Sequence, residues 1–472
     1  MKNNARSWLL AAVVCFMTTA AGVARAEPNE SPFPVRVSKS GRYLEDASGK
    51  PFLLHGDTAW MLMVELTREE TEEYLENRRQ KQFNTILVSL GETNLPGDPT
   101  TNKYGDPMFT TPEDLSTPNE KFFAHVDWVI QKAHQKGILV VLNPCYVQSS
   151  FKRGLGDAVV ANGPEKCRSY GRYLGKRYKN STNIIWQAMG DRTPAPGSAL
   201  ERNWLEILLG IKESAPSHHW TAHWSNFTTA LDQAAFAPHM TLDNTYSGNR
   251  TYIQILRAYN RTKPKPTYLN EAHYEGTGVP SYASAENEAP QMIRAQAYWS
   301  LLSGATGHIF GSHYVWHFGW KGSTKYTNSN DWRKGMESQG SREIVHVKKL
   351  FEGRAWYDLV PDQDHSIVTK GYGTFGKDDR TPGGDYVTAA RTADGKLIMA
   401  YVPSTGTKPR TITVDMAKLG GPATARWFNP TDGTYHAIAG SPLANSGSRE
   451  FATPGDNGTG TNDLVLVLEA AP

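Results

Sequence analysis

Two carboxylates in this sequence occupy positions from which both could act on one bond. Asp191 follows the apolar segment 183–190, and Glu271 follows the segment 267–270. Each segment is typical of a buried strand, so each carboxylate is expected where a strand ends. One carboxyl group can protonate a leaving oxygen while the other attacks or activates water, which is what glycoside cleavage requires. A single acid in such a place more often caps a loop or forms a buried salt bridge, but the pair favours catalysis.

Aromatic and polar side chains gather at the other predicted strand ends, where they could stack on sugar rings or bind hydroxyl groups. The candidate substrate-binding residues are Asp57, Trp60, His223, Tyr246, His273 with its neighbour Tyr274, and Trp316. A structural role is the alternative for several of them. Asp57 could cap a loop, Trp60 could belong to the core, His223 could be structural, and Trp316 could only cover the strand ends. If the main pair is misassigned, Asp57 and Glu275 are the next carboxylates to consider.

Short apolar segments alternate with helical patterns and predict an α/β protein, a (β/α)8 TIM barrel. The expected strands are 52–55, 85–90, 137–142, 183–187, 220–224, 240–243, 267–270 and 308–311. Strands four and seven face one another across the mouth of such a barrel, which brings Asp191 and Glu271 together. A doubly wound open sheet is the alternative, but no Gly-x-Gly-x-x-Gly turn follows an early strand.

Helix start signals stand between several of these strands. Thr67 and Glu70 form a capping box that opens a helix to about Lys81. Thr117 as N-cap and Pro118 as first residue predict a second helix. Further amphipathic helices are expected at 164–178, 199–213 and 288–303.

The composition changes near residue 362. Beyond it, Gly, Thr and Pro are frequent and short strand patterns alternate with turn signals such as Asp394-Gly395 and Asp432-Gly433. This predicts a small antiparallel β-sandwich after the barrel. The expected organisation is a signal peptide at 1–26, a catalytic barrel with an N-terminal hairpin at 27–361, and the sandwich at 362–472.

The N-terminal residues predict export. A basic start with Lys2 and Arg6, a short apolar run and a Val-Ala-Arg-Ala cleavage pattern at 23–26 indicate a cleavable signal peptide and a periplasmic or secreted protein. Removing it takes three of the 50 basic residues and leaves 47 to balance 47 acids. The neutral mature chain argues against a nucleic-acid partner, and no further stretch predicts a membrane anchor.

Several motifs resemble the apiosidase-like glycoside hydrolases, family 140. They are PFLLHGDTAWML (51–62), NRRQKQFNTI (77–86), NIIWQAMGD (183–191) and LNEAHYEG (269–276). The tail resembles a collagen-binding type of domain, with ARWFNP (425–430) as its most specific segment. Together these motifs span nearly all of the mature chain.

The resemblance implies a barrel plus a β-sandwich that acts on β-linked apiose in plant cell-wall pectin. It maps the acid/base onto Asp191 and the nucleophile onto Glu271. The wider clan of retaining barrel glycosidases carries Asn-Glu after strand four, whereas this chain has Gly190-Asp191. The collagen-binding label finds no support in the tail itself, where a sandwich packed on the barrel is expected.

Two other function classes stay open. A metal-dependent hydrolase is suggested by His218, His219, His223, His308, His313 and His317, but these form no His-Glu-x-x-His pattern and no strand-one His-x-His pair. We therefore expect no metal and no cofactor, and an oligo- or polysaccharide as substrate. A non-catalytic carbohydrate- or matrix-binding protein is the second alternative. The sugar, exo or endo action, the oligomeric state and a disulfide between Cys145 and Cys167 are open at this stage.

Overall fold

The computed structural model describes residues 31–91, 100–148, 154–248, 250–276, 289–319, 332–378 and 383–471. The predicted signal peptide at 1–26 lies outside these ranges. Within them, no helix combines the length and the hydropathy needed to cross a membrane.

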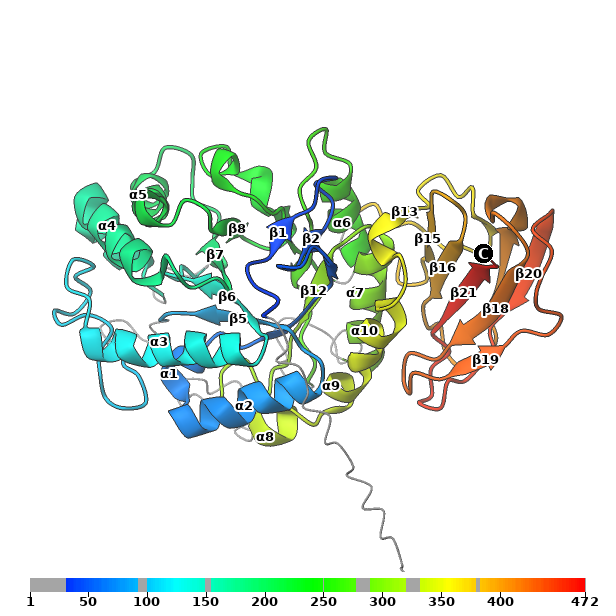
Figure 1. The fold of residues 1–472 in the computed structure, drawn as a ribbon, viewed down its shortest axis with the longest axis horizontal. Helices are drawn as coiled ribbons and strands as arrows, with labels where there is room; N and C mark the ends of the chain where they lie inside the picture. The colour runs from blue at the N-terminus through cyan, green and yellow to red at the C-terminus, as the bar shows by residue number, and fades with distance from the viewer. Residues whose placement is uncertain are drawn as a thin grey trace, which may run out of the picture. The chain divides into compact units, whose positions relative to one another are not determined.

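A mostly parallel sheet forms the centre of the fold (Figure 1). Over the described residues its order is β8-β7-β6-β5-β4-β12-β11-β10-β9, and of its neighbouring pairs only β9 and β10 run antiparallel. The strands are β4 (Leu54–Thr58), β5 (Thr85–Ser89), β6 (Leu139–Asn143), β7 (Ile184–Met189), β8 (His219–His223), β9 (Thr228–Thr229), β10 (Thr245–Tyr246), β11 (Leu269–Glu271) and β12 (Gly307–Phe310). This sheet, with its helices, confirms the predicted TIM-type barrel.

The predicted sixth strand at 240–243 is wrong. The amides of Thr241 and Leu242 both donate to the carbonyl of Trp220, at 2.9 and 3.1 Å, instead of forming a ladder. These bonds join β8 to the segment that precedes β10 and nearly close the barrel. Met240 and Leu242 are buried, which produced the strand-like apolar pattern. The strand itself, β10, follows at Thr245–Tyr246.

Helices surround the strands, and their caps follow local chemistry. The capping box of Thr67 and Glu70 is confirmed at the start of α2 (Arg68–Gln80). The predicted Thr117 cap is wrong: Asn119 accepts the amide of Lys121 at the start of α3 (Glu120–Gln135), and Thr117 binds back to the Asp114 carbonyl. The other helices are α1 (Leu62–Glu65), α4 (Gly156–Tyr178), α5 (Ala199–Ser214), α6 (Thr251–Tyr259), α7 (Pro290–Leu302), α8 (Trp332–Gly335), α9 (Gln339–Glu343) and α10 (Val345–Phe351).

Antiparallel sheets form the C-terminal region and confirm the predicted sandwich. One sheet has the order β13-β15-β16-β21-β18-β19 and the other β14-β17-β20, as far as the chain is described. Their strands are β13 (Leu359–Pro361), β14 (Val368–Lys370), β15 (Thr388–Thr392), β16 (Leu397–Val402), β17 (Thr411–Asp415), β18 (Ala423–Phe428), β19 (Tyr435–Ala437), β20 (Ser448–Ala452) and β21 (Leu464–Ala470). The predicted boundary at residue 362 falls directly after β13.

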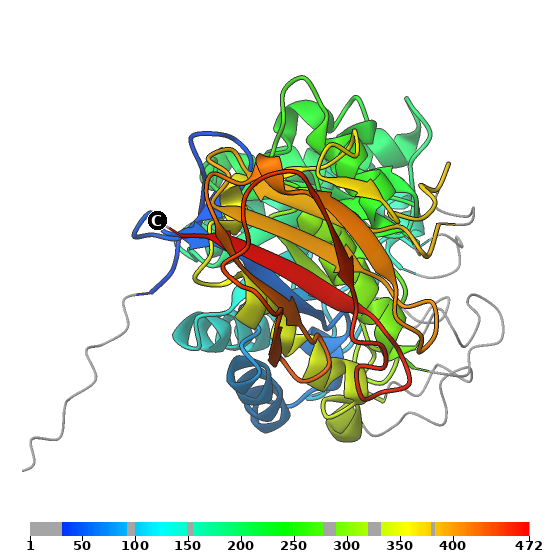
Figure 2. The ribbon, with the colours of Figure 1, turned by 90° about the vertical axis from the view of Figure 1, so that its right-hand side faces the viewer.

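The sandwich packs on the barrel through α7. Tyr298 stacks on Tyr401 of β16 with ring centroids 5.0 Å apart, and the Trp299 indole donates to the Tyr386 carbonyl at 2.9 Å. Both views place the strands of the sandwich against this side of the barrel (Figures 1 and 2). One buried cluster therefore includes residues of both regions.

Two smaller features complete the fold. The expected N-terminal hairpin is part of a three-stranded sheet formed by β1 (Arg36–Val37), β2 (Leu44–Glu45) and β3 (Pro51–Phe52). Cys145 and Cys167 are buried free thiols, which answers the open question of their pairing.

Candidate active site

Asp191, His223 and Glu271 meet at the C-terminal ends of β7, β8 and β11. The Nε2 atom of His223 lies 3.1 Å from Asp191 Oδ1 and 3.1 Å from Glu271 Oε2. The imidazole is fully buried, whereas 29% of the Asp191 side chain and 12% of the Glu271 side chain are exposed. The structure thus brings together the two predicted catalytic carboxylates and one of the predicted substrate-binding residues.

Strand alternation explains why His223 reaches both acids. Trp220 stacks on Trp186 and faces the helix layer. Side chains alternate along β8, so Thr221 and His223 both point to the other face, into the barrel. Asn270 of β11 contacts the second imidazole nitrogen, with Nδ2 2.9 Å from Nδ1. With Nδ2 as donor, the Asn270 amide requires His223 Nδ1 to be unprotonated, as in a neutral imidazole. If the amide is turned by 180°, its Oδ1 accepts from a protonated Nδ1 instead. The turned amide also gives a partner to the buried Asn270 Oδ1, which otherwise has none.

The electrostatics of the site favour a charged His223. Burial acts to lower the pKa of this imidazole, but Asp191 and Glu271 outweigh it and raise the pKa to about 9. Burial raises the pKa of Glu271, and the nearby Asp191 adds to this, while His223 and Tyr274 act in the opposite direction. By contrast, burial lowers the pKa of both His313 and His317 to about 4. His223 is therefore the site histidine that holds a proton at neutral pH, and the turned Asn270 amide is the arrangement that fits it.

Aromatic side chains enclose the three groups. The Tyr246 ring stacks on His223 with centroids 4.6 Å apart, and the nearby Glu271 helps to raise the pKa of the Tyr246 phenol, after the larger effect of burial. The Trp60 indole donates to the Tyr274 hydroxyl at 3.0 Å, and Tyr274 acts to lower the pKa of Glu271. Trp60 also packs near His223, with centroids 5.6 Å apart, and against Tyr146 at 5.1 Å. These rings enclose His223 and leave Glu271 largely buried beside it.

The backbone before Asp191 takes an unusual course. Met189 has a φ of 63°, a left-handed conformation that costs free energy in a non-glycine residue. The Asn143 side-chain amide donates to the Met189 carbonyl and holds it there. A Cβ atom on Gly190 would lie 2.5 Å from the Val147 carbonyl oxygen, so this position has no room for the Asn of the wider clan. The close approach of Gly190 to the β6 loop sets the direction in which Asp191 leaves the strand.

Asp57 does not join the group, and its prediction as a sugar-binding residue is corrected. Its side chain is fully buried on the helix side of β4, where it accepts from the Tyr74 hydroxyl at 2.7 Å and pairs with Arg78 at 3.2 Å. His55, two residues earlier, stacks on Phe83 on the same side. Asp57 therefore joins β4 to α2.

His273 and Trp316 lie in neighbouring walls of the mouth. The half-buried His273 is close enough to His313 to influence its titration, and His313 packs 5.3 Å from the Tyr274 ring. Trp316 is half-buried, and its carbonyl accepts the Met61 amide at 3.1 Å. This bond joins the loops that follow β4 and β12. Neither side chain has a contact with the catalytic carboxylates among those described, so their role as substrate-binding residues stays a prediction.

The same three polar groups have the composition of a metal site. One ligand atom each from Asp191, His223 and Glu271 lies within 4.8 Å of the others. Carboxylate and imidazole ligands suit zinc and similar ions, but the imidazole must then be neutral. A metal ion would therefore compete with the proton that the two carboxylates hold on His223.

A cavity of about 320 Å³ lies beside the loop that follows Asp191. Arg192 and Asp157 contribute its charged groups, and Val147, Val160 and Leu200 are among its apolar lining residues. Neither Asp191 nor Glu271 lines it. Its lining residues Arg192 and Val147 lie next to Asp191 and Gly190.

Sequence reasoning missed Asn270, Asn143 and Tyr146. Asn270 immediately precedes Glu271, and strand alternation predicts the opposite face for it, so its contact with His223 could not be inferred from the sequence. Asn143 and Tyr146 follow the predicted strand 137–142, so their place near the barrel mouth was expected, but their contacts to Met189 and Trp60 could not be read from the sequence.

Comparison with protein families matches two regions of the chain. Residues 38–358 match the family described as "Apiosidase-like, catalytic domain". Residues 373–469 match the family described as "Putative collagen-binding domain of a collagenase". No curated protein matches the chain.

Two solved structures with a similar fold are described as glycoside hydrolases. A structure titled "Glycoside hydrolase" is 25% identical, with a TM-score of 0.77, and the match covers 93% of this chain and 98% of that one. A glycoside hydrolase family 5 structure from Bacteroides vulgatus is 23% identical, with a TM-score of 0.76 and 94% of both chains covered. The similarity extends over the barrel and the sandwich together.

Proposed function

The chain belongs to the apiosidase-like family of glycoside hydrolases, and we propose that it is a retaining enzyme that cleaves β-linked apiose from plant cell-wall pectin. In this proposal Asp191 is the acid/base and Glu271 the nucleophile. The export signal expected at residues 1–26 is consistent with a polymeric substrate outside the cell. The family match supports the sugar, and the geometry of the carboxylates supports the mechanism.

The separation of the two carboxylates favours retention. Retaining enzymes hold their carboxyl groups about 5–5.5 Å apart, whereas inverting enzymes leave about 6.5–9.5 Å for a water molecule. Here one oxygen of Asp191 and one of Glu271 lie within 4.8 Å of each other, which is compatible with the shorter of the two separations.

The proposed reaction has two steps. In the first, a Glu271 oxygen bonds the anomeric carbon as its bond to the leaving oxygen breaks, and Asp191 gives its proton to that oxygen. In the second, Asp191 takes a proton from water, the water oxygen bonds the anomeric carbon, and the bond to Glu271 breaks.

The shared His223 contact is the observation that carries this assignment. It places both carboxylates beside one buried, charged ring, which acts against the rise that burial causes in the pKa of Glu271. The test is to incubate the purified protein with a panel of aryl glycosides and pectic oligosaccharides that includes β-apiosides, and to record the first-formed product by proton NMR. Release of apiose with its β configuration supports the proposal. An inverted first product contradicts retention, and cleavage restricted to another sugar contradicts the substrate.

A metal-dependent hydrolase is a second candidate, because Asp191, His223 and Glu271 also have the spacing of a metal site. Extensive dialysis against a chelator, followed by activity measurement with and without added Zn²⁺ or Mn²⁺, separates the two. Unchanged activity supports the carboxylate mechanism. Loss of activity that only a metal ion restores supports the alternative.

A further inference from the structure

A buried ion pair connects the sandwich to the barrel. Arg294 of α7 bonds Asp463, which precedes β21, through Nε at 3.1 Å and Nη2 at 2.8 Å. Both side chains are at most 1% exposed. The guanidinium group stays charged at every relevant pH, so it needs these carboxylate oxygens to remain buried.

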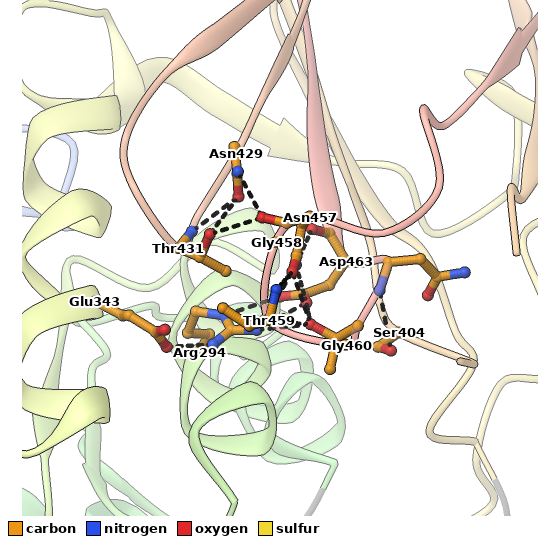
Figure 3. A network of polar contacts seen from close by, with 12 residues as sticks. Arg294, Glu343, Ser404, Asn429, Thr431, Asn457, Gly458, Thr459, Gly460 and Asp463 are labelled. Carbon is orange, nitrogen blue, oxygen red and sulfur yellow. Dashed lines mark hydrogen bonds and ion pairs between the residues drawn. The ribbon is translucent and has the colours of Figure 1, made fainter. Parts of the chain in front are cut away.

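The residues around Asp463 are arranged to receive this guanidinium (Figure 3). Asn457 donates to Asp463 Oδ1 at 2.8 Å, and Tyr401 of β16 donates to Oδ2 at 3.2 Å. Thr461 accepts from Arg294 at 3.2 Å and donates to Asp463 at 2.9 Å. The loop 457–463 of the sandwich thus forms a polar pocket, and the Arg294 side chain of the barrel occupies it.

Arg294 continues the connection toward the catalytic loop. It also bonds Glu343, the last residue of α9. At the start of α9, the Gly340 amide and the Ser338 hydroxyl donate to the buried Glu275 carboxylate at 2.6 and 2.5 Å.

Glu275 in turn stands in the loop that carries Glu271. Its amide donates to the Gly311 carbonyl at 2.9 Å, and its carbonyl accepts the His313 amide at 2.8 Å. Contacts therefore run from Asp463 through Arg294, Glu343 and α9 to Glu275, four residues after the proposed nucleophile.

We propose that the sandwich is an integral part of the catalytic unit, and that Arg294, held by Asp463, is a positioning residue for the loop 271–276. The relevance to catalysis rests on the proposed function, whereas the mechanical coupling does not. The sandwich in this view completes the barrel from outside and need not bind a ligand of its own.

The physical reason is the cost of an unpaired buried charge. Without Asp463, Arg294 must shift toward water or toward Glu343 to recover its hydrogen bonds. A shift of Arg294 changes the position of Glu343 and of the five-residue α9, whose first turn binds the Glu275 carboxylate. The loop after β11 then loses part of its support.

The test compares Asp463→Asn with Val414→Ala in the full chain. Val414 is a buried residue of β17 in a cluster formed by sandwich residues only. Asp463→Asn removes the charge but keeps the shape, and Val414→Ala destabilises the same region without touching the network. Glu343→Gln breaks the connection at the α9 end and replaces Asp463→Asn if that variant does not fold.

Amide hydrogen exchange of peptides covering 269–276, measured well below the unfolding temperature, is the first measurement. We expect Asp463→Asn and Glu343→Gln to exchange about tenfold faster there, and Val414→Ala to match the parent chain. If exchange rises equally in all three variants, or rises in none of them, the proposed coupling between Asp463 and the loop 271–276 is wrong. This result does not depend on any enzymatic activity.

Turnover of the best glycoside substrate is the second measurement. We expect kcat to fall about tenfold in the two network variants with KM within about twofold, because positioning the nucleophile affects the chemical step more than binding. Faster exchange with unchanged kcat overturns the positioning role of Arg294. If the parent chain cleaves no glycoside but the network variants still exchange faster, the proposed function is wrong and the mechanical coupling stands.

Discussion

The Nε2 atom of His223 lies 3.1 Å from a carboxylate oxygen of Asp191 and 3.1 Å from one of Glu271. A single nitrogen therefore lies between two acids with different proposed roles, hydrogen-bonded to Asp191 and at ion-pair distance from Glu271. When Asp191 carries the proton for the leaving group, this N–H is available to the Glu271 carboxylate. When Glu271 is bonded to the sugar, it is available to Asp191 as Asp191 activates water. His223 can thus support whichever carboxylate is charged in each step.

The first prediction concerns stability against pH. The pKa of His223 is about 9 in the folded chain, above its ordinary value of 6.5. Between these values the folded chain binds one proton more than the unfolded chain, so the free energy of unfolding falls as pH rises, by up to about 1.4 kcal/mol per pH unit. The stabilisation is complete below pH 6.5 and is lost as pH passes 9.

The matched variant is His223→Gln, which cannot take up this proton. Urea unfolding of both chains from pH 6 to 10 should show a decline between pH 7 and 9 that is shallower in the variant by about 1 kcal/mol per pH unit. Parallel curves for the two chains would show that His223 is not charged in the folded state.

The second prediction concerns Asp57. Asp57→Asn should destabilise the chain by about 3–5 kcal/mol, because it leaves the buried Arg78 without its carboxylate. The partly exposed Glu213 is a control, and Glu213→Gln should lower the free energy of unfolding far less, because solvent screens its ion pairs. At temperatures where Asp57→Asn stays folded, KM should match that of the parent chain. A raised KM without a loss of stability would restore Asp57 as a sugar-binding residue.

The third prediction concerns the glycine before the proposed acid/base. A methyl group at Gly190 would collide with the backbone of Val147, so Gly190→Ala should displace Asp191 and lower kcat by at least about tenfold. Gly384 has open space around its Cβ direction, and Gly384→Ala should leave kcat unchanged. Steady-state kinetics on both variants checks this, and equal kcat values would mean that the loop tolerates a side chain at 190.

The fold was predictable from the sequence where periodicity and caps are strong. The barrel, the sandwich and the α2 capping box followed from such patterns, and the comparisons confirmed the family. The sixth strand was misplaced because buried residues Met240 and Leu242 resemble a strand whether or not their amides form a ladder. Burial is visible in a sequence, but hydrogen-bond partners are not.

The candidate site was predictable only in part. Strand order brought Asp191 and Glu271 together, because parallel strands end at the same edge of a barrel. Asp57 was misread because its position at a strand end does not say which face it occupies, and one residue along a strand reverses the face. The ring contact of Asn270 with His223 joins two strands that are far apart in sequence, which no local pattern reports.

The most direct test of the central claim is azide rescue of Glu271→Ala and Asp191→Ala with an aryl glycoside that has a good leaving group. Both variants should lose activity on natural linkages by roughly 10³-fold or more. In Glu271→Ala, azide enters from the vacated face and should give a glycosyl azide of inverted configuration. In Asp191→Ala, the glycosyl-enzyme still forms and azide should give a product of retained configuration. Products of the same configuration from both variants, or rescue of neither, would contradict the assignment of Glu271 as nucleophile and Asp191 as acid/base.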